Sequence, residues 1–164
     1  MSNETIPIAV FDCMTFLQAV ARSEGAASAW FQMVEAGRVK LVVSTAILAE
    51  VEDVLDRPKI RQKNPKLTDE TVAAFLIRVR ELAPPAIVVP AAFAYARDPD
   101  DEPYLNLAIV STAGYIISRD NDLLDLMQED NPDGQAFRAL TPGIQILTPP
   151  EFLRVLRYQV ANAS

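Results

Sequence analysis

The sequence predicts an α/β fold, a three-layer α/β/α sandwich around a mostly parallel sheet. Short runs of β-branched and aromatic residues alternate with longer segments whose apolar residues recur every three or four positions. Such alternation is typical of strands joined through crossover helices, which make the strands parallel and place helices on both faces of the sheet. A length of 164 residues suits one domain over residues 1–164, with enough chain to bury a hydrophobic core.

The first two predicted strands lie in the N-terminal third of the chain. Residues 6–11 form a buried strand that ends at Asp12, and residues 41–43 form the second strand. Ser44 or Thr45 then caps the next helix. Between the two strands we expect two helices, because their apolar residues have helical spacing: Phe16, Leu17 and Val20 in one, and Trp30, Phe31 and Val34 in the other.

The middle of the chain contains a basic window, a helix and a β-like run. Two prolines interrupt the basic residues 57–66, which predicts a loop there. Thr68 is typical of a helix N-cap, and the helix should run to residue 82. The apolar residues 87–89 then predict a third strand.

The C-terminal part repeats the pattern of helix and strand. A helix should follow the acidic segment 98–101, and residues 115–117 should form the fourth strand, with another helix beginning near Asn121. Residues 128–143 contain Asn-Pro-Asp-Gly, which predicts an irregular loop. The chain should end with a strand over residues 144–147 and a helix from Pro150 to Tyr158.

The residue types that are missing restrict the possible chemistry. The chain contains no histidine and a single cysteine, Cys13. This composition excludes Ser–His–Asp and Cys–His catalysis, an internal disulfide and the usual zinc sites. A hydrolase of this kind must activate water by another route. Carboxylate-bound Mg²⁺ or Mn²⁺ is the natural cofactor, because hard cations prefer oxygen ligands.

Acidic residues from four distant segments are expected to meet at one edge of the sheet. Asp12 ends the first strand and Asp120 closely follows the strand over residues 115–117, so both lie where ligands gather in α/β folds. Glu50 can lean back toward this edge from the second turn of its helix. Asp101 opens the helix that precedes residues 115–117. A divalent cation would relieve the repulsion among these carboxylates.

Each acid also has a purely structural explanation. Asp101 and Asp120 stand where helix N-caps belong, and Glu50 is compatible with a solvated helix surface. Asp12 is harder to explain in this way, because an acid at the end of an apolar strand needs a counter-charge. The expected convergence of all four favours a metal site.

The charge of the chain is unevenly distributed. The net charge is −7, yet one ten-residue window holds five basic residues and no acid: Arg57, Lys59, Arg61, Lys63 and Lys66. This window is compatible with a solvated basic loop or with contacts to nucleic-acid phosphates. Arg119, beside Asp120, is a second candidate for phosphate contact.

Four blocks of sequence, in this order, resemble the PIN domain. They are Val10-Phe11-Asp12, residues 44–50, residues 98–101 with Leu105 and Ala108, and residues 114–124. The likeness runs from about residue 6 to the final helix, and it is closest to the toxin branch of toxin–antitoxin systems, relatives of the VapC-type toxins. It implies a PIN-like fold and a metal-dependent endoribonuclease that leaves a 5′-phosphate and a 3′-hydroxyl.

The resemblance also implies roles for individual residues. Asp122 becomes an accessory metal ligand, Ser118 a polar residue lining the site, and Asp98 either part of the site or a turn-forming residue. Many relatives have Thr or Ser and then Asn after the first Asp, whereas this chain has Cys13 and Met14, which leaves a polar contact near the metal in question. The metal-binding acids implied are Asp12, Glu50, Asp101 and Asp120.

Partners and location follow from the resemblance and from the termini. The family likeness implies an RNA substrate, a homodimer and an antitoxin protein that covers the crevice. Glu4 stands where a signal peptide would have basic residues, and no apolar run approaches the roughly 18 residues of a membrane span. We therefore expect a cytoplasmic protein with no membrane partner.

Two other classes of function compete with a nuclease. A phosphoaspartyl phosphatase would usually have a second Asp two residues after the first, where this chain has Met14, and a receiver domain would have an acidic pair before the end of that strand. The alternative to a nuclease is a non-catalytic RNA- or protein-binding module on a PIN scaffold with an eroded site, which Cys13 and Met14 would support.

Overall fold

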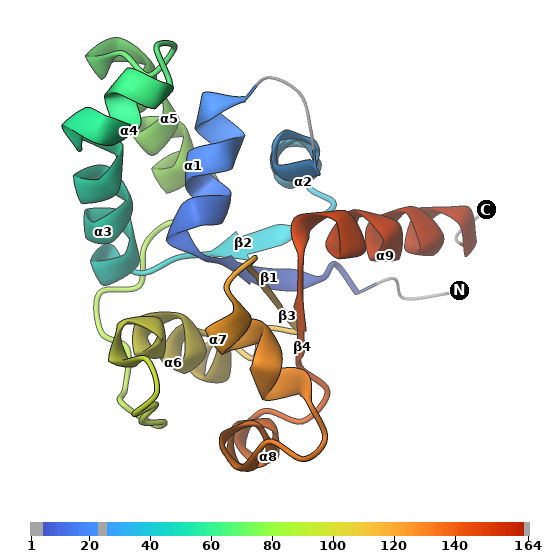
Figure 1. The fold of residues 1–164 in the computed structure, drawn as a ribbon. Helices are drawn as coiled ribbons and strands as arrows, with labels where there is room; N and C mark the ends of the chain where they lie inside the picture. The colour runs from blue at the N-terminus through green and yellow to red at the C-terminus, as the bar shows by residue number, and fades with distance from the viewer. Residues whose placement is uncertain (1–4, 23–25, 163–164) are drawn as a thin grey trace.

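The computed structural model describes residues 5–22 and 26–162, and these residues contain a parallel sheet of four short strands. The strand order is β2-β1-β3-β4, and each neighbouring pair is parallel. Helices flank the sheet on both sides (Figure 1). The predicted three-layer α/β/α class is therefore confirmed. The strands are β1 (Ile8–Phe11), β2 (Lys40–Val42), β3 (Tyr115–Ile117) and β4 (Gln145–Leu147).

The helices form three groups around the sheet (Figure 1). One face is covered by α1 (Cys13–Ala21), α2 (Ala26–Glu35) and α9 (Pro149–Asn162). The opposite face is covered by α6 (Glu102–Val110), α7 (Asn121–Leu124) and α8 (Pro132–Leu140), with the short 3₁₀ helices η1 (Pro99–Asp101) and η2 (Asp125–Met127). Beyond the edge strand β2 lie α3 (Thr45–Leu55), α4 (Pro58–Lys63) and α5 (Asp69–Leu82).

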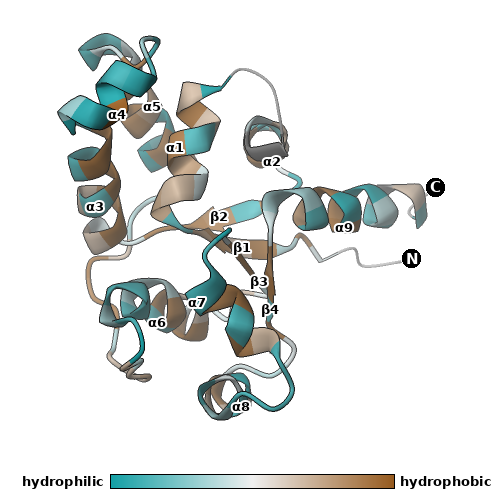
Figure 2. Cartoon of the chain, viewed as in Figure 1, coloured by the Kyte–Doolittle hydropathy of each residue, from teal (hydrophilic) through white to brown (hydrophobic). Residues whose placement is uncertain are grey.

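The hydrophobic core lies on both faces of the sheet. The strands of the sheet are mostly apolar, as Figure 2 shows. In β1, Ala9, Val10 and Phe11 are all fully buried. The Phe11 ring lies 3.7 Å from that of Trp30 on α2, measured between ring centroids. The ring of Phe152 on α9 lies 6.3 Å from that of Phe11, so both α2 and α9 pack against the strand that ends at Asp12. None of the helices described is long and apolar enough to cross a bilayer.

The prediction of a strand over residues 87–89 is wrong. Only Ala86 pairs with the sheet, through an isolated parallel bridge to Ser44. Ile87 and Val88 are 83% and 81% exposed, so their apolar character does not reflect burial. Prolines at positions 84, 85 and 90 lack the N–H group that a strand ladder needs, which explains why the pairing stops after one residue.

Two segments predicted as loops are helices. Residues 132–140 form α8, in which the Asn131 side chain accepts a hydrogen bond from Gly134 N. Residues 58–63 of the basic window form α4, with Pro58 in its first turn. In both cases the proline starts a helix rather than a turn, because its missing N–H is unused in the first turn.

The parallel strands place several polar residues at one edge of the sheet. Asp12 follows β1 and caps α1, and Ser44 follows β2 and caps α3. Asp120 follows β3 after two residues and caps α7. This edge is where the acidic residues gather.

Candidate metal centre

Asp12 is held in place by three hydrogen bonds. Its Oδ1 accepts from Thr15 N at 2.8 Å and from Thr15 Oγ1 at 2.6 Å, and its Oδ2 accepts from Ser118 Oγ. The side chain is buried, and burial raises the pKa of Asp12 even though these donors act in the opposite direction. The negative charge of Asp120 also raises this pKa, so the two acids lie within electrostatic reach.

Ser118 connects Asp12 to the segment after β3. Its hydroxyl donates to Asp12 and accepts from Asp120 N at 2.9 Å. Because Ser118 is fully buried, this hydroxyl faces the two acids and not the solvent. The residue expected to line the site therefore positions its acids.

Four carboxylates form the tightest acidic group, which we call the acidic quartet. Each contributes one oxygen, and all of these oxygens lie within 4.8 Å of one another. Asp98 also caps η1, with Asp100 N donating to it at 3.1 Å, and Asp120 caps α7. The members of the acidic quartet are Asp98, Asp101, Asp120 and Asp122.

Asp101 is the least satisfied member of the acidic quartet. It precedes α6 but makes no capping hydrogen bond, so the structural explanation for this acid does not apply. The side chain is only 6% exposed, and its buried Oδ2 has no hydrogen-bond partner among the described residues. Burial raises the pKa of Asp101 to about 8, and the negative charges of Asp120 and Asp98 add to the shift. Such a group needs a proton or a cation.

Glu50 lies outside the acidic quartet but contacts the same region. Its Oε2 accepts from the Tyr104 hydroxyl at 2.8 Å, and that hydroxyl accepts from Cys13 N at 3.2 Å. Burial and the bond to Glu50 both raise the pKa of Tyr104, so the phenol remains a donor. Tyr104 of α6 therefore joins α3 to the first residue of α1.

Asp122 is fixed by the segment that precedes η1. Arg97 Nε lies 2.7 Å from Asp122 Oδ1, and Arg97 Nη2 lies 2.9 Å from Asp125 Oδ2. The Tyr95 hydroxyl donates to the backbone oxygen of Asp122 at 2.6 Å. Arg97 is thus a cation in direct contact with the acidic quartet.

A family model described as PIN domain matches residues 9–122, more than half of the chain. The chain belongs to the PIN domain family. The matched span includes Asp12, Glu50 and the whole acidic quartet. PIN domains are generally metal-dependent nucleases that use divalent ions, in agreement with the clustered carboxylates. No curated protein and no solved structure matched the chain.

The basic window at residues 57–66 contains arginines that pair with acids of the protein and lysines that do not. Arg57 pairs with Asp53 at 3.0 Å, and Arg61 bonds the backbone oxygens of Leu55 and Leu67. Arg61 also pairs with Asp69 at 3.0 Å, so it has a structural role in joining α4 to α5. In the described chain, no ion pair involves the exposed lysines of this window, Lys59, Lys63 and Lys66.

The position of α4 differs from that of Arg119. Figure 1 shows α4 at the end of α3 that points away from the sheet. Arg119 is exposed beside Asp120, and its Nε donates to Gln18 Oε1 at 3.2 Å. Of the expected phosphate contacts, Arg119 is therefore the one closest in sequence to an acid of the quartet.

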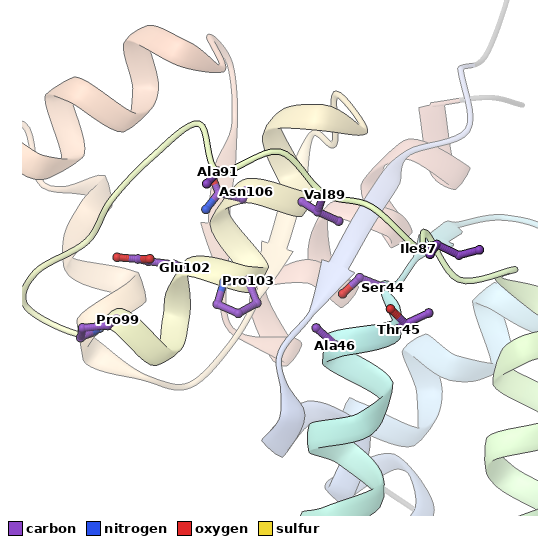
Figure 3. Close-up of a pocket in the computed structure, with 10 residues that line it drawn as sticks. All are labelled: Ser44, Thr45, Ala46, Ile87, Val89, Ala91, Pro99, Glu102, Pro103 and Asn106. Atoms are coloured by element: carbon purple, nitrogen blue, oxygen red, sulfur yellow. The ribbon is translucent and has the colours of Figure 1, made fainter.

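A pocket of about 390 Å³ lies beside the segment that carries Asp101. Figure 3 shows its lining on the start of α3, the segment after Ala86 and the start of α6. The amide oxygen of Asn106 accepts from Ala92 N and Phe93 N, so this polar group is already used. The lining is mainly apolar, with Glu102 as its charged residue: Ser44, Thr45, Ala46, Ile87, Val89, Ala91, Pro99, Glu102, Pro103 and Asn106.

Several residues of the site were not assigned from the sequence. Thr15, three residues after the capping Asp12, donates a hydrogen bond from its hydroxyl to Asp12 Oδ1. The N3 position of a helix could have indicated this contact. Tyr104 and Arg97 carry no local signal, because their partners lie 54 and 28 residues away at Glu50 and Asp125.

Proposed function

We propose that this PIN domain is an endoribonuclease that hydrolyses RNA phosphodiester bonds with Mg²⁺ or Mn²⁺. The observation that carries the proposal is the buried, unpartnered carboxylate oxygen of Asp101 beside the other acids of the quartet. An isolated charge in this position is costly, and a shared cation removes that cost. The absence of histidine from the sequence leaves carboxylates as the ligands at hand.

The acids at the strand ends fit a hard divalent ion. Asp12, Asp101 and Asp120 would hold it, Asp122 would be an accessory ligand, and Glu50 would complete or orient the shell. Their oxygen-only chemistry suits Mg²⁺ or Mn²⁺. When bound, such an ion supplies a reactive water near neutral pH and stabilises charge on the phosphate oxygens.

The neighbouring residues keep these acids in position. Thr15 and Ser118 donate to Asp12, which stabilises its ionised form and fixes its direction. Tyr104 fixes Glu50 in the same way. In the proposed reaction, water attacks phosphorus and the 3′ oxygen leaves, so the products are a 5′-phosphate and a 3′-hydroxyl.

RNA contacts would come from the basic residues. Lys59, Lys63 and Lys66 are exposed and available for phosphates, and Arg119 lies beside the acids. Arg57 and Arg61 are further candidates, although both already pair with acids of the protein. Positive side chains are required because the acidic edge itself repels RNA.

We further propose that the protein is the toxin of a toxin–antitoxin pair, acting in the cytoplasm as a homodimer. The support is the order of its motifs, which is closest to that branch of the family. Production of the chain in a host cell should then arrest growth, and the Asp12→Asn variant should not. Normal growth with the active chain would contradict the toxin role and leave the nuclease activity untouched.

RNA cleavage with and without divalent ions tests the proposed activity. Asn keeps the helix cap at position 12, so Asp12→Asn should fold normally yet lose at least about 100-fold in rate. Asp100→Asn is the matched control, because this exposed acid lies outside the acidic quartet. Cleavage that is independent of metal, or retained by Asp12→Asn, would contradict the proposal and favour a non-catalytic role for the site.

A further inference from the structure

We propose that the pocket at the start of α6 is a subsite for one nucleotide of the RNA substrate and selects a base that carries an amino group. This inference rests on the proposed function, because the occupant is a nucleotide next to the scissile phosphate. The pocket has a volume of about 390 Å³, within the range of roughly 300–1,000 Å³ that is typical of small-molecule sites. One base and its ribose fit such a volume.

The pocket lies next to residues of the candidate metal centre on two helices. On α3, the lining residue Ala46 precedes Glu50 by one helical turn, so both lie on the same face. On α6, the lining residue Pro103 directly precedes Tyr104, whose hydroxyl donates to Glu50 at 2.8 Å. A nucleotide in the pocket can therefore direct its phosphate toward the acids.

The charge of the lining favours a base over a phosphate. Of the ten described residues that line the pocket, Glu102 alone is charged and none is basic. A phosphate would be repelled there, whereas the edge of a base can donate a hydrogen bond to a carboxylate. Figure 3 shows Glu102 and Ile87 on opposite sides of the lining, with Val89 and Pro103 between them. These apolar side chains suit the faces of a base.

Glu102 presents one carboxylate oxygen that is fixed in direction and free to accept. Its Oε1 accepts from Tyr95 N at 2.8 Å, which orients the side chain. Within residues 5–22 and 26–162, no hydrogen bond or ion pair reaches Glu102 Oε2. Such an oxygen accepts from the amino group of cytosine and repels the carbonyl oxygen that uracil has in its place. The pocket should therefore prefer cytosine to uracil, which has the same ring.

Ile87 adds an exposed apolar wall on the other side of the pocket. It is 83% exposed, and neighbouring prolines at positions 84, 85 and 90 keep its segment out of the sheet. A nucleotide bound with its ribose on this side would cover part of that surface. The next residue, Val88, is 81% exposed but does not line the pocket. The two residues form a matched pair for a test.

Binding of short RNAs to Asp12→Asn in the presence of Mg²⁺ tests the base preference without cleavage. The probes are a fluorescent oligouridine and the same RNA with one cytosine at its centre. Fluorescence anisotropy should show that the cytosine RNA binds about tenfold more tightly. Adding Glu102→Gln keeps the acceptor for Tyr95 N but turns the free oxygen into an amide donor, so the preference should disappear or reverse. Adding Asp100→Asn, an exposed acid outside the pocket, should leave the preference unchanged.

The matched pair tests the apolar wall in the same assay. Ile87→Ser should weaken binding of the cytosine RNA about fivefold, because it removes apolar contact with the bound nucleotide. Val88→Ser removes an equally exposed side chain and should leave the affinity unchanged. Equal effects of the two substitutions would contradict the proposed position of the nucleotide.

The outcomes separate this proposal from the proposed function. Equal affinities for the two RNAs, or a preference that Glu102→Gln retains, would overturn the subsite even if RNA is cleaved, and would favour a polypeptide as the occupant of the pocket. Cytosine-selective binding without any cleavage by the wild-type protein would contradict the nuclease and leave the subsite standing. Far-UV circular dichroism of each variant verifies that the folded state is being measured.

Discussion

The acidic edge of the sheet and the basic window at residues 57–66 both concentrate charge, but the chain builds them in opposite ways. The acids come from separate segments, and the fold brings them together beyond β1 and β3. The basic residues are neighbours in sequence, yet they have different roles. Arg61 binds Leu55 of α3 and Asp69 of α5, whereas Lys59 and Lys63 remain exposed.

This difference shows which kind of clustering indicates a site. Like charges that are close in sequence disperse over a helix surface and find local partners, as Arg57 does with Asp53. Like charges that converge from distant segments repel one another and need an external partner. Asp101 is the residue in which this need is most evident.

The largest expected effect is the loss of cleavage in Asp101→Asn. Asn is uncharged and a poorer ligand, so the metal-dependent rate should fall at least about 100-fold. Arg61→Ala should leave the rate per folded molecule within about threefold, because its partners are backbone oxygens and acids that do not belong to the quartet. Single-turnover rates of both variants measure the contrast. Similar losses in the two would contradict it.

Arg61 should matter for stability instead. Its guanidinium is partly buried and bonds two backbone oxygens, so Arg61→Ala should lower the free energy of unfolding by about 2 kcal/mol. Urea denaturation measures this loss, and Lys63→Ala is the matched control. If Arg61→Ala changes the free energy of unfolding by less than about 0.5 kcal/mol, this arginine has no structural role and again becomes a candidate for RNA contact.

The exposed lysines should affect RNA binding by an ionic mechanism. Replacing Lys59, Lys63 and Lys66 with Ala should weaken binding of single-stranded RNA about tenfold in low salt. The slope of log affinity against log salt should become shallower by about 2, since each phosphate contact contributes about 0.7. Fluorescence anisotropy at several salt concentrations measures the slope. An unchanged slope would show that these three lysines do not contact RNA phosphates.

A smaller effect is expected on the pH dependence of stability. Burial raises the pKa of Asp101 to about 8, so the folded protein retains a proton that the unfolded chain loses near pH 4. This stabilisation is fully present below pH 4 and is lost as the pH rises through 8. Without metal, the wild-type Tm should therefore fall by about 5 °C relative to Asp101→Asn between pH 6 and pH 8, since the loss amounts to about 2 kcal/mol.

Divalent ions should reverse that loss. Mg²⁺ replaces the proton on the acids, so it should raise the wild-type Tm more at pH 8 than at pH 6. Differential scanning calorimetry of the wild type and Asp101→Asn measures both trends. Parallel pH profiles of the two proteins would show that Asp101 is not an unsatisfied acid.

Much of the framework could be predicted from the sequence because it depends on local signals. The apolar runs that end at Asp12 and near Asp120 determine two adjacent strands, and Ser44 and Thr68 act as the caps expected of them. The prediction of a strand over residues 87–89 failed because its local sequence signal is ambiguous. Ile87 and Val88 have strand-forming side chains, but neighbouring prolines prevent a strand ladder.

The site was only partly predictable, for a different reason. Asp101 and Asp120 were expected near the sheet edge, and both belong to the acidic quartet. Asp98 joins them because a segment pinned by Tyr95 and Arg97 brings it there, and those contacts span more than 20 residues. Hydrogen-bond partners chosen by tertiary packing have no periodic pattern that sequence can reveal.

Anomalous diffraction from crystals soaked in Mn²⁺ tests most directly whether distant carboxylates share a cation. The account predicts a manganese peak between Asp101 and Asp120, about 2.2 Å from an oxygen of each. A manganese peak elsewhere on the surface, or an empty acidic edge at millimolar Mn²⁺, would contradict it.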